Sequence, residues 1–256
     1  MKKYAVLFFL LALVLSLTGC AENAVLEETY VYEAETQIHS LEIRVGAADF
    51  TIQPADAFSV ESNLKYLSVS EDDGVLTIID KKTTGVTYDN PILTVYIPEA
   101  FMFENVRIAT GAAKLTADWL AANTVKLQLG AGDVSIANLC AVSNADIEGG
   151  AGKITVGSGT IRDLELEMGM GELNLTAVLL GDNDLTFGVG ESNITLLGSR
   201  EDYSIDAEKG IGSITIDGKS AVEYEGGNGQ NRVQIEGGVG AIHLKFQESD
   251  SKQHQV

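Results

Sequence analysis

A short glycine motif recurs at nearly constant spacing through the second half of the chain, and this spacing limits the fold more than any other feature. The first glycine of the motif lies at positions 111, 130, 150, 169, 188, 210 and 238. The intervals are therefore 19, 20, 19, 19, 22 and 28 residues. An outlying copy, GAADFTI, begins at Gly46. A period of this size predicts an array of similar supersecondary units.

Apolar and polar residues alternate on both sides of the motif, as they do in half-buried strands. Before the motif, the apolar residues lie at odd distances from the first glycine; after it, they lie at even distances. Because a one-residue shift inside a straight strand would turn its core side to solvent, we expect one strand to end at the motif and the chain to bend there. Glycine suits such a corner because it accepts positive φ. The expected corner glycines are Gly130, Gly132, Gly150, Gly152, Gly169, Gly171, Gly188, Gly190, Gly210, Gly212, Gly238 and Gly240.

These units predict an all-β fold, a single-stranded parallel β-helix or solenoid with coils of about 19 residues. Equivalent residues of neighbouring coils would then stack about 4.8 Å apart. An antiparallel β-sandwich built from hairpins is the alternative. We assign residues 111–246 to the regular solenoid and residues 36–110 to a less regular β part, which would form the bulkier first coils and cap the end of the solenoid.

The N-terminus resembles the signal peptide of a bacterial lipoprotein. Two lysines precede an apolar run from Tyr4 to Leu15, and the sequence LTGC ending at Cys20 resembles a lipobox. The resemblance implies cleavage after residue 19 and lipidation of the Cys20 sulfur, so that the chain is held in a membrane. An ordinary secretory signal is the alternative. Residues 20–35 would be the lipidated tether, and residues 247–256 a disordered tail.

The charge balance excludes one class of partner. Without residues 1–19 the chain has 15 basic and 37 acidic residues, a formal charge of −22. Such a chain repels nucleic acids and anionic headgroups, so we expect no nucleic-acid partner. With Cys20 lipidated, Cys140 has no cysteine partner, and we expect it to be a small buried residue.

The sequence contains no complete motif that is typical of enzyme chemistry. SITIDGKS has Ser213 where a phosphate-binding loop needs its first glycine, and the motif copies lack the third glycine of a dinucleotide fingerprint. The three histidines are scattered, and no cluster has metal-ligand spacing. We therefore expect no enzyme, no cofactor and no catalytic residue. A carbohydrate-active enzyme is an alternative by fold analogy alone.

Carboxylates recur at the outward positions two and four residues before the glycines. In a solenoid they would form two adjacent columns on one face, which would either keep a flat sheet soluble or bind a cationic protein, peptide or surface ligand. Weak binding of divalent cations is a further expectation for this face. The candidate residues are Asp146, Glu148, Glu165, Glu167, Asp184, Asp206, Glu208 and Glu236.

The order of segments resembles a known family. LEIRVGAADFTIQP, DGVLTI and YIPEA are followed by serial units like GAGDVSI, and this order is similar to that of the bacterial "putative-adhesin" family of β-strand-repeat proteins, a domain of unknown function. The likeness covers most of residues 38–246. It implies a β-solenoid exposed in the cell envelope.

We therefore expect a lipid-anchored, non-enzymatic protein that binds or scaffolds at the cell surface, as an adhesin does. The expected location is the extracytoplasmic face of the cell membrane, with the outer membrane as the alternative. The expected partners are the membrane, through the lipid, and an unidentified protein, peptide or surface ligand. An accessory of a membrane stress-sensing or signalling system is the alternative function.

Overall fold

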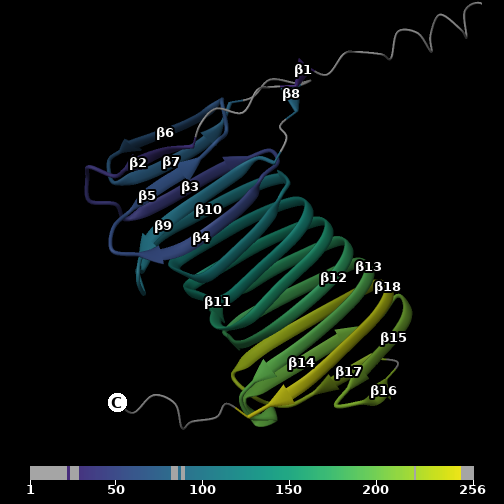
Figure 1. Ribbon diagram of the computed structural model, residues 1–256. Helices are drawn as coiled ribbons and strands as arrows, with labels where there is room; N and C mark the ends of the chain where they lie inside the picture. Colours follow the sequence, from purple (N-terminus) through teal and green to yellow (C-terminus); the bar gives the residue numbers. More distant parts are fainter. Residues whose placement is uncertain (1–21, 24–28, 82–85, 88–89, 222, 249–256) are drawn as a thin grey trace, which may run out of the picture.

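The structure is a computed structural model that describes residues 22–23, 29–81, 86–87, 90–221 and 223–248. The expected signal peptide, Cys20 and most of the expected tail lie outside the described residues. Strands wind round one axis and stack as coils (Figure 1). The elements are β1 (Glu22–Asn23), β2 (Tyr30–Glu33), β3 (Ser40–Val45), β4 (Asp49–Ala55), β5 (Ser59–Ser62), β6 (Leu67–Asp72), β7 (Val75–Asp80), β8 (Val86–Thr87), β9 (Ile92–Pro98), β10 (Phe103–Ala112), β11 (Lys114–Arg162), β12 (Leu164–Leu180), β13 (Asp182–Leu197), the 3₁₀ turn η1 (Arg200–Asp202), β14 (Tyr203–Glu208), β15 (Ile211–Ile216), β16 (Lys219–Ala221), β17 (Glu223–Gly226) and β18 (Asn231–Gln247).

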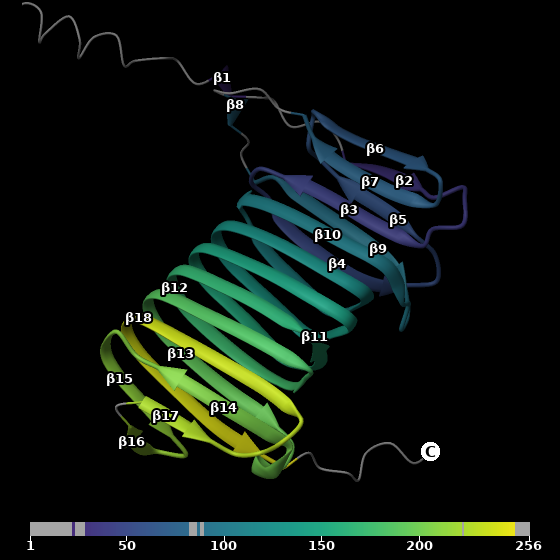
Figure 2. The same cartoon turned by 180° about the vertical axis from the view of Figure 1, so that it is seen from behind.

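Neighbouring coils pair in parallel. This confirms the prediction of a mostly parallel all-β fold, and the alternative of an antiparallel sandwich is wrong. Residue 103 pairs with 122, residue 145 with 164, and residue 165 with 184. Each coil has two long sides, so that two layers of strands face each other across the core; the reverse view in Figure 2 shows the second layer.

The core is built from columns of aliphatic side chains. In β12, Leu164, Leu166 and Met168 are buried before the glycine motif, and the buried positions resume at Leu173 and Leu175 after it. The inward phase therefore shifts across the motif, and both long sides of the coil point apolar side chains at one core. Burial of these apolar side chains makes the largest favourable contribution to the free energy of folding.

The glycine motifs differ from the expectation in one respect. A strand was expected to end at each motif, but β12 and β13 continue through theirs. Cross-coil pairing persists at Ala151 with Met170 and at Gly152 with Gly171, so the chain bends without leaving the ladder. The second glycine makes this bend possible because its φ is positive, +136° at Gly171 and +149° at Gly190.

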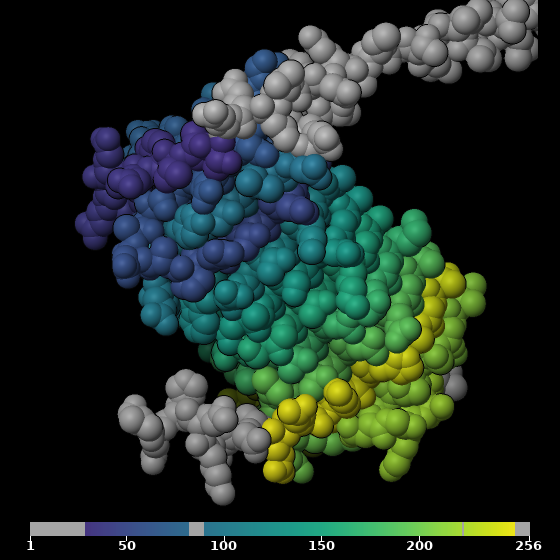
Figure 3. All heavy atoms as spheres, in the orientation of Figure 1, coloured from purple at the N-terminus to yellow at the C-terminus, as the bar shows by residue number. Residues whose placement is uncertain are grey.

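The coils at the C-terminal end do not stack in chain order. The last strand, β18, pairs in parallel with β13 on one side and with both β14 and β15 on the other. In the space-filling view the yellow band of β18 lies between the green of β13 and the yellow-green of the strands that precede it in sequence (Figure 3). The end of the described chain is thus held inside the stack.

The N-terminal end has the same arrangement. Strand β3 lies between β7 and β10, and β4 lies between β9 and β11, so the first coil is also an inner coil. Antiparallel strands complete both ends, β6 and β5 at one and β17 and β16 at the other. Such strands cover the parallel edges, which would otherwise invite edge-to-edge aggregation.

The expected tether, residues 20–35, extends too far. Residues 30–33 form β2, which pairs antiparallel with β5. Next to it, the Glu71 carboxylate accepts hydrogen bonds from the Thr36 hydroxyl, the amides of Glu35 and Thr36, and the Tyr32 hydroxyl. These contacts, the Thr36 hydroxyl first, lower the pKa of Glu71 to about 2, although desolvation acts in the opposite direction. The alternation in YVYE and the packing of Tyr32 against the core explain why this segment is ordered.

No helix within the described ranges is long and apolar enough to cross a membrane.

Candidate interaction face

The eight candidate carboxylates lie on one face, which we call the acidic face. They occupy outward positions in β11, β12, β13, β18 and β14, and the parallel registers place them in two columns. In stacking order the first column is Asp146, Glu165, Asp184, Gln234 and Asp206. The second is Glu148, Glu167, Thr186, Glu236 and Glu208. The insertion of β18 thus changes the order of the last two rungs from that of the chain.

Most of these carboxylates are exposed. Asp146 and Asp206 are partly buried, and the other six side chains are exposed. Within the described ranges, Lys126 is the only cation that forms an ion pair with any of the eight. Like charges in adjacent rungs repel, because opposed side chains in a sheet lie about 5 Å apart. The face therefore carries uncompensated negative charge that a cationic partner would relieve.

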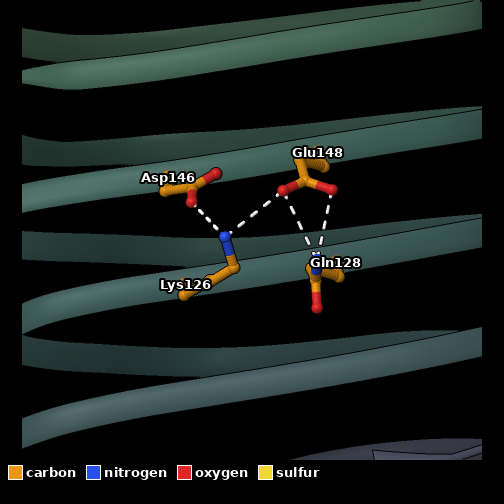
Figure 4. A network of polar contacts seen from close by, with 4 residues as sticks. All are labelled: Lys126, Gln128, Asp146 and Glu148. Carbon is orange, nitrogen blue, oxygen red and sulfur yellow. Dashed lines mark hydrogen bonds and ion pairs between the residues drawn. The ribbon is translucent and has the colours of Figure 1, made fainter.

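Lys126 closes the N-terminal side of this face (Figure 4). Its ammonium contacts Asp146 and lies 3.3 Å from the Glu148 Oε1, while the Gln128 amide donates to the Glu148 Oε2 at 3.2 Å. The hydrogen bonds to Asp146 and then Glu148 raise the pKa of Lys126. The hydrogen bonds from Gln128 and then Lys126 lower the pKa of Glu148. Both shifts favour the charged forms of Lys126 and Glu148.

The same columns become basic beyond Lys126. Arg107 pairs in register with Lys126 on one side and with Glu42 on the other, and Arg44 lies next to Ala109 in the second column. One face thus has a short basic end and a longer acidic end. Sequence reasoning missed this change of sign, although Lys126 and Arg107 stand at the same distance before their glycines as Asp146 does.

Strand β17 widens the acidic end. It pairs antiparallel with β14, so that Glu225 lies beside Asp206 and Glu223 beside Glu208. Both glutamates are exposed. They lie outside the glycine repeat, so the repeat alone could not have indicated them.

The other long side of the coils is polar and mostly neutral. Asn193 donates to Asn174 at 3.1 Å, and the Thr215 hydroxyl lies 2.7 Å from the His243 Nδ1. Neighbouring coils are thus joined here by hydrogen bonds. Glu172 and Glu191 also lie on this side, where they accept hydrogen bonds from Asn174 and Asn193, so carboxylates are fewer here than on the acidic face.

A buried asparagine was also missed. Asn183 is only 1% exposed and joins three coils: its amide oxygen accepts from the Leu164 amide at 3.1 Å, and its amide nitrogen donates to the Arg232 carbonyl at 2.9 Å and to that of Leu180 at 3.3 Å. It stands five residues before Gly188, where the other coils have an apolar residue. This polar residue in an otherwise apolar column was the sequence signal that could have indicated a buried, hydrogen-bonded side chain.

The corner glycines have a structural explanation. A Cβ built on Gly190 would lie 1.7 Å from the Gly171 carbonyl oxygen, and one on Gly188 would lie 2.2 Å from that of Gly169. Coils approach too closely at the corner for a side chain. No group of three or more His, Cys, Asp or Glu side chains in the described part of the chain could hold a metal ion. Cys140 is partly buried.

The geometry defines a stacked-coil all-β protein with one strongly acidic side. The chain belongs to the family whose model is described as Toastrack DUF4097, which matches residues 38–255. Searching the curated proteins gives no match to this chain.

Solved structures show the same fold. A "putative adhesin" from Bacteroides fragilis is 13% identical, with a TM-score of 0.57 over 87% of this chain and 99% of that chain. A second "putative adhesin", from Parabacteroides distasonis, is 14% identical, with a TM-score of 0.50 over 86% of this chain and 98% of that chain. At these identities the likeness concerns the fold alone.

Proposed function

We propose that this protein is a lipid-anchored component of the cell envelope that binds or scaffolds at the cell surface without catalysis. It would be held through Cys20 at the extracytoplasmic face of the cell membrane and would use the acidic face as its contact surface. The adhesin names of its structural relatives agree with a binding role, and the lipobox-like LTGC agrees with the anchor.

The in-register columns of the acidic face carry this proposal. Five stacked coils expose carboxylates in two adjacent columns, and two further glutamates of β17 extend them. Exposed like charges at this spacing cost some stability, since side chains directly opposite in a sheet repel. A cationic ligand would remove that cost on binding and would be steered towards the face from a distance.

Crosslinking in intact cells tests this proposal. Wild-type protein is compared with Cys20→Ala, which is expected to be secreted without an anchor, and with a variant in which Glu165, Glu167 and Asp184 are replaced by Gln, Gln and Asn. We expect the wild type to crosslink to a discrete surface partner, and the charge-neutral variant to lose that crosslink. Mass spectrometry identifies the partner and the crosslinked residues.

The Cys20→Ala arm separates the two non-enzymatic functions. A partner that is retained by the secreted form indicates a surface ligand, as we propose. A membrane partner that depends on the anchor would indicate an accessory of a membrane sensing system instead. If the charge-neutral variant crosslinks as well as the wild type, the acidic face is not the contact surface.

A further inference from the structure

A shallow groove runs along the solenoid axis beside the acidic face. It crosses five consecutive coils, from β10 through β13, and has a volume of about 590 Å³. Its lining includes Glu148, Glu167 and the glycines Gly150 and Gly169. We call it the corner groove.

Apolar atoms reach the surface in this groove. Met168 and Phe187 line it and are 7% and 8% exposed, more than nearly all other members of the core cluster. The adjoining part of the chain is more apolar still. Met170 directly follows the groove glycine Gly169 and is 59% exposed, and Val189 directly follows Gly188 and is 51% exposed.

These exposed side chains continue as a ridge along the corner. Met170 pairs in register with Val189, Val189 with Val239, and Val239 with Ile211, which is 75% exposed. We call these four residues the corner ridge. At the basic end of the molecule the same position holds alanine, Ala112 and Ala131, and it is still alanine at Ala151 in the first acidic coil. Contiguous exposed apolar residues of this kind mark interaction sites on soluble proteins.

We propose that the corner groove and corner ridge dock an amphipathic helical segment that has basic and apolar side chains. This inference rests on the proposed function and specifies the chemistry of its partner. Apolar side chains of the segment would cover the ridge and the exposed edges of Met168 and Phe187. Its basic side chains would meet the carboxylates of Glu165, Glu167 and Asp184.

The spacing of the coils favours a helix. Coils stack about 4.8 Å apart, a helix rises about 5.4 Å per turn, and every second residue of an extended strand lies about 6.7 Å from the last. A helix along the axis therefore offers about one basic side chain per coil, and the small mismatch is within reach of flexible lysine and arginine side chains. An extended segment falls out of register after two coils.

Charge disfavours the other occupants. A second copy of this chain would bring a second acidic face against the first, and an anionic membrane would be repelled by the same carboxylates. Nucleic acid is excluded on the same ground. A basic amphipathic segment satisfies both the apolar ridge and the acidic columns.

A designed peptide tests this inference on the purified full chain. The probe is a fluorescein-labelled 18-residue peptide of leucine and lysine arranged with one apolar helical face, and binding is followed by fluorescence anisotropy. Two control peptides have the same composition in scrambled order and the same pattern with glutamate in place of lysine. We expect saturable binding of the amphipathic basic peptide, at least about tenfold tighter than that of either control.

Two variants locate the site. We expect Met170→Ser/Val189→Ser to weaken binding about tenfold, because it removes exposed apolar contact area. We expect Glu165→Gln/Glu167→Gln/Asp184→Asn to weaken binding by a similar factor, because each of three exposed charge pairs contributes modestly. A matched triple variant removes three exposed acidic residues elsewhere and should stay within about twofold of wild type. It carries Glu33→Gln, Glu99→Gln and Asp118→Asn. Thermal melts of every variant check that the fold is kept.

Several results would overturn the inference. The inference fails if the amphipathic basic peptide does not bind, if the scrambled peptide binds equally well, or if the matched variant loses as much affinity as the acidic-face variant. It also fails if phosphatidylcholine vesicles bind through the corner ridge, or if the free chain forms a dimer that Met170→Ser/Val189→Ser dissociates. If the peptide does not bind but a partner is still captured in cells through the acidic face, the helix inference fails and the proposed function stands.

Discussion

Replacing Gly190 by alanine should destabilise the protein by more than about 3 kcal/mol, because the new Cβ would meet the Gly171 carbonyl oxygen at 1.7 Å in a backbone conformation with φ of +149°. The clash is with backbone of the next coil, so relief requires the coils to separate. For a chain of this size, the melting temperature should fall by about 6–12 °C or more. Thermal unfolding followed by circular dichroism measures this change.

Gly218→Ala is the matched control. Gly218 also has positive φ, +74°, but a Cβ there would have nothing within 4 Å. Only the backbone strain remains, and we expect a loss of about 1–2 kcal/mol. Equal losses for the two variants would mean that close approach of the coils at the corner is not what requires glycine.

Asn183→Ala should cost about 2–4 kcal/mol, because it leaves the buried Leu164 amide and the Arg232 carbonyl without their hydrogen-bond partner. These groups belong to the coils on either side, so the variant loosens three coils at once. Urea unfolding with a linear extrapolation gives the free energy of unfolding.

Asn193→Ala provides the comparison for this variant. Asn193 is partly buried and also bonds across coils, to Asn174 at 3.1 Å, but solvent can replace that contact. We expect a change within about 1 kcal/mol. A loss at Asn183 no larger than that at Asn193 would contradict a bridging role for the buried amide.

The glycine repeat was enough to predict stacked parallel strands, but it could not predict the order of stacking. Every coil presents the same apolar columns, so β13 would accept either β14 or β18 as its neighbour. The choice depends on the irregular chain between residues 217 and 230, which contains no copy of the repeat. The inner position of β3 escaped prediction for the same reason.

The acidic columns could be predicted because their residues stand at fixed distances from the glycines. Features formed by residues outside the repeat could not be predicted in this way. Glu223 and Glu225 reach the face through an antiparallel strand, and the corner groove is formed jointly by residues of five stacked coils. The ridge residues Met170 and Ile211 were visible in the motif, but their exposure follows only from the bend of the corner.

The most direct test of the stacked acidic face is disulfide trapping of its register. Thr186 lies beside Glu236 in the structure, whereas Glu208 lies one coil further. In a Cys140→Ser background, Thr186→Cys/Glu236→Cys should form a disulfide, since paired coils lie about 4.8 Å apart. Thr186→Cys/Glu208→Cys should not, because two coils span about 9.6 Å and a disulfide needs less than about 7 Å between Cα atoms. Mass spectrometry under non-reducing conditions gives the result, and a disulfide in the second pair but not the first would contradict the inner position of β18 and the face built on it.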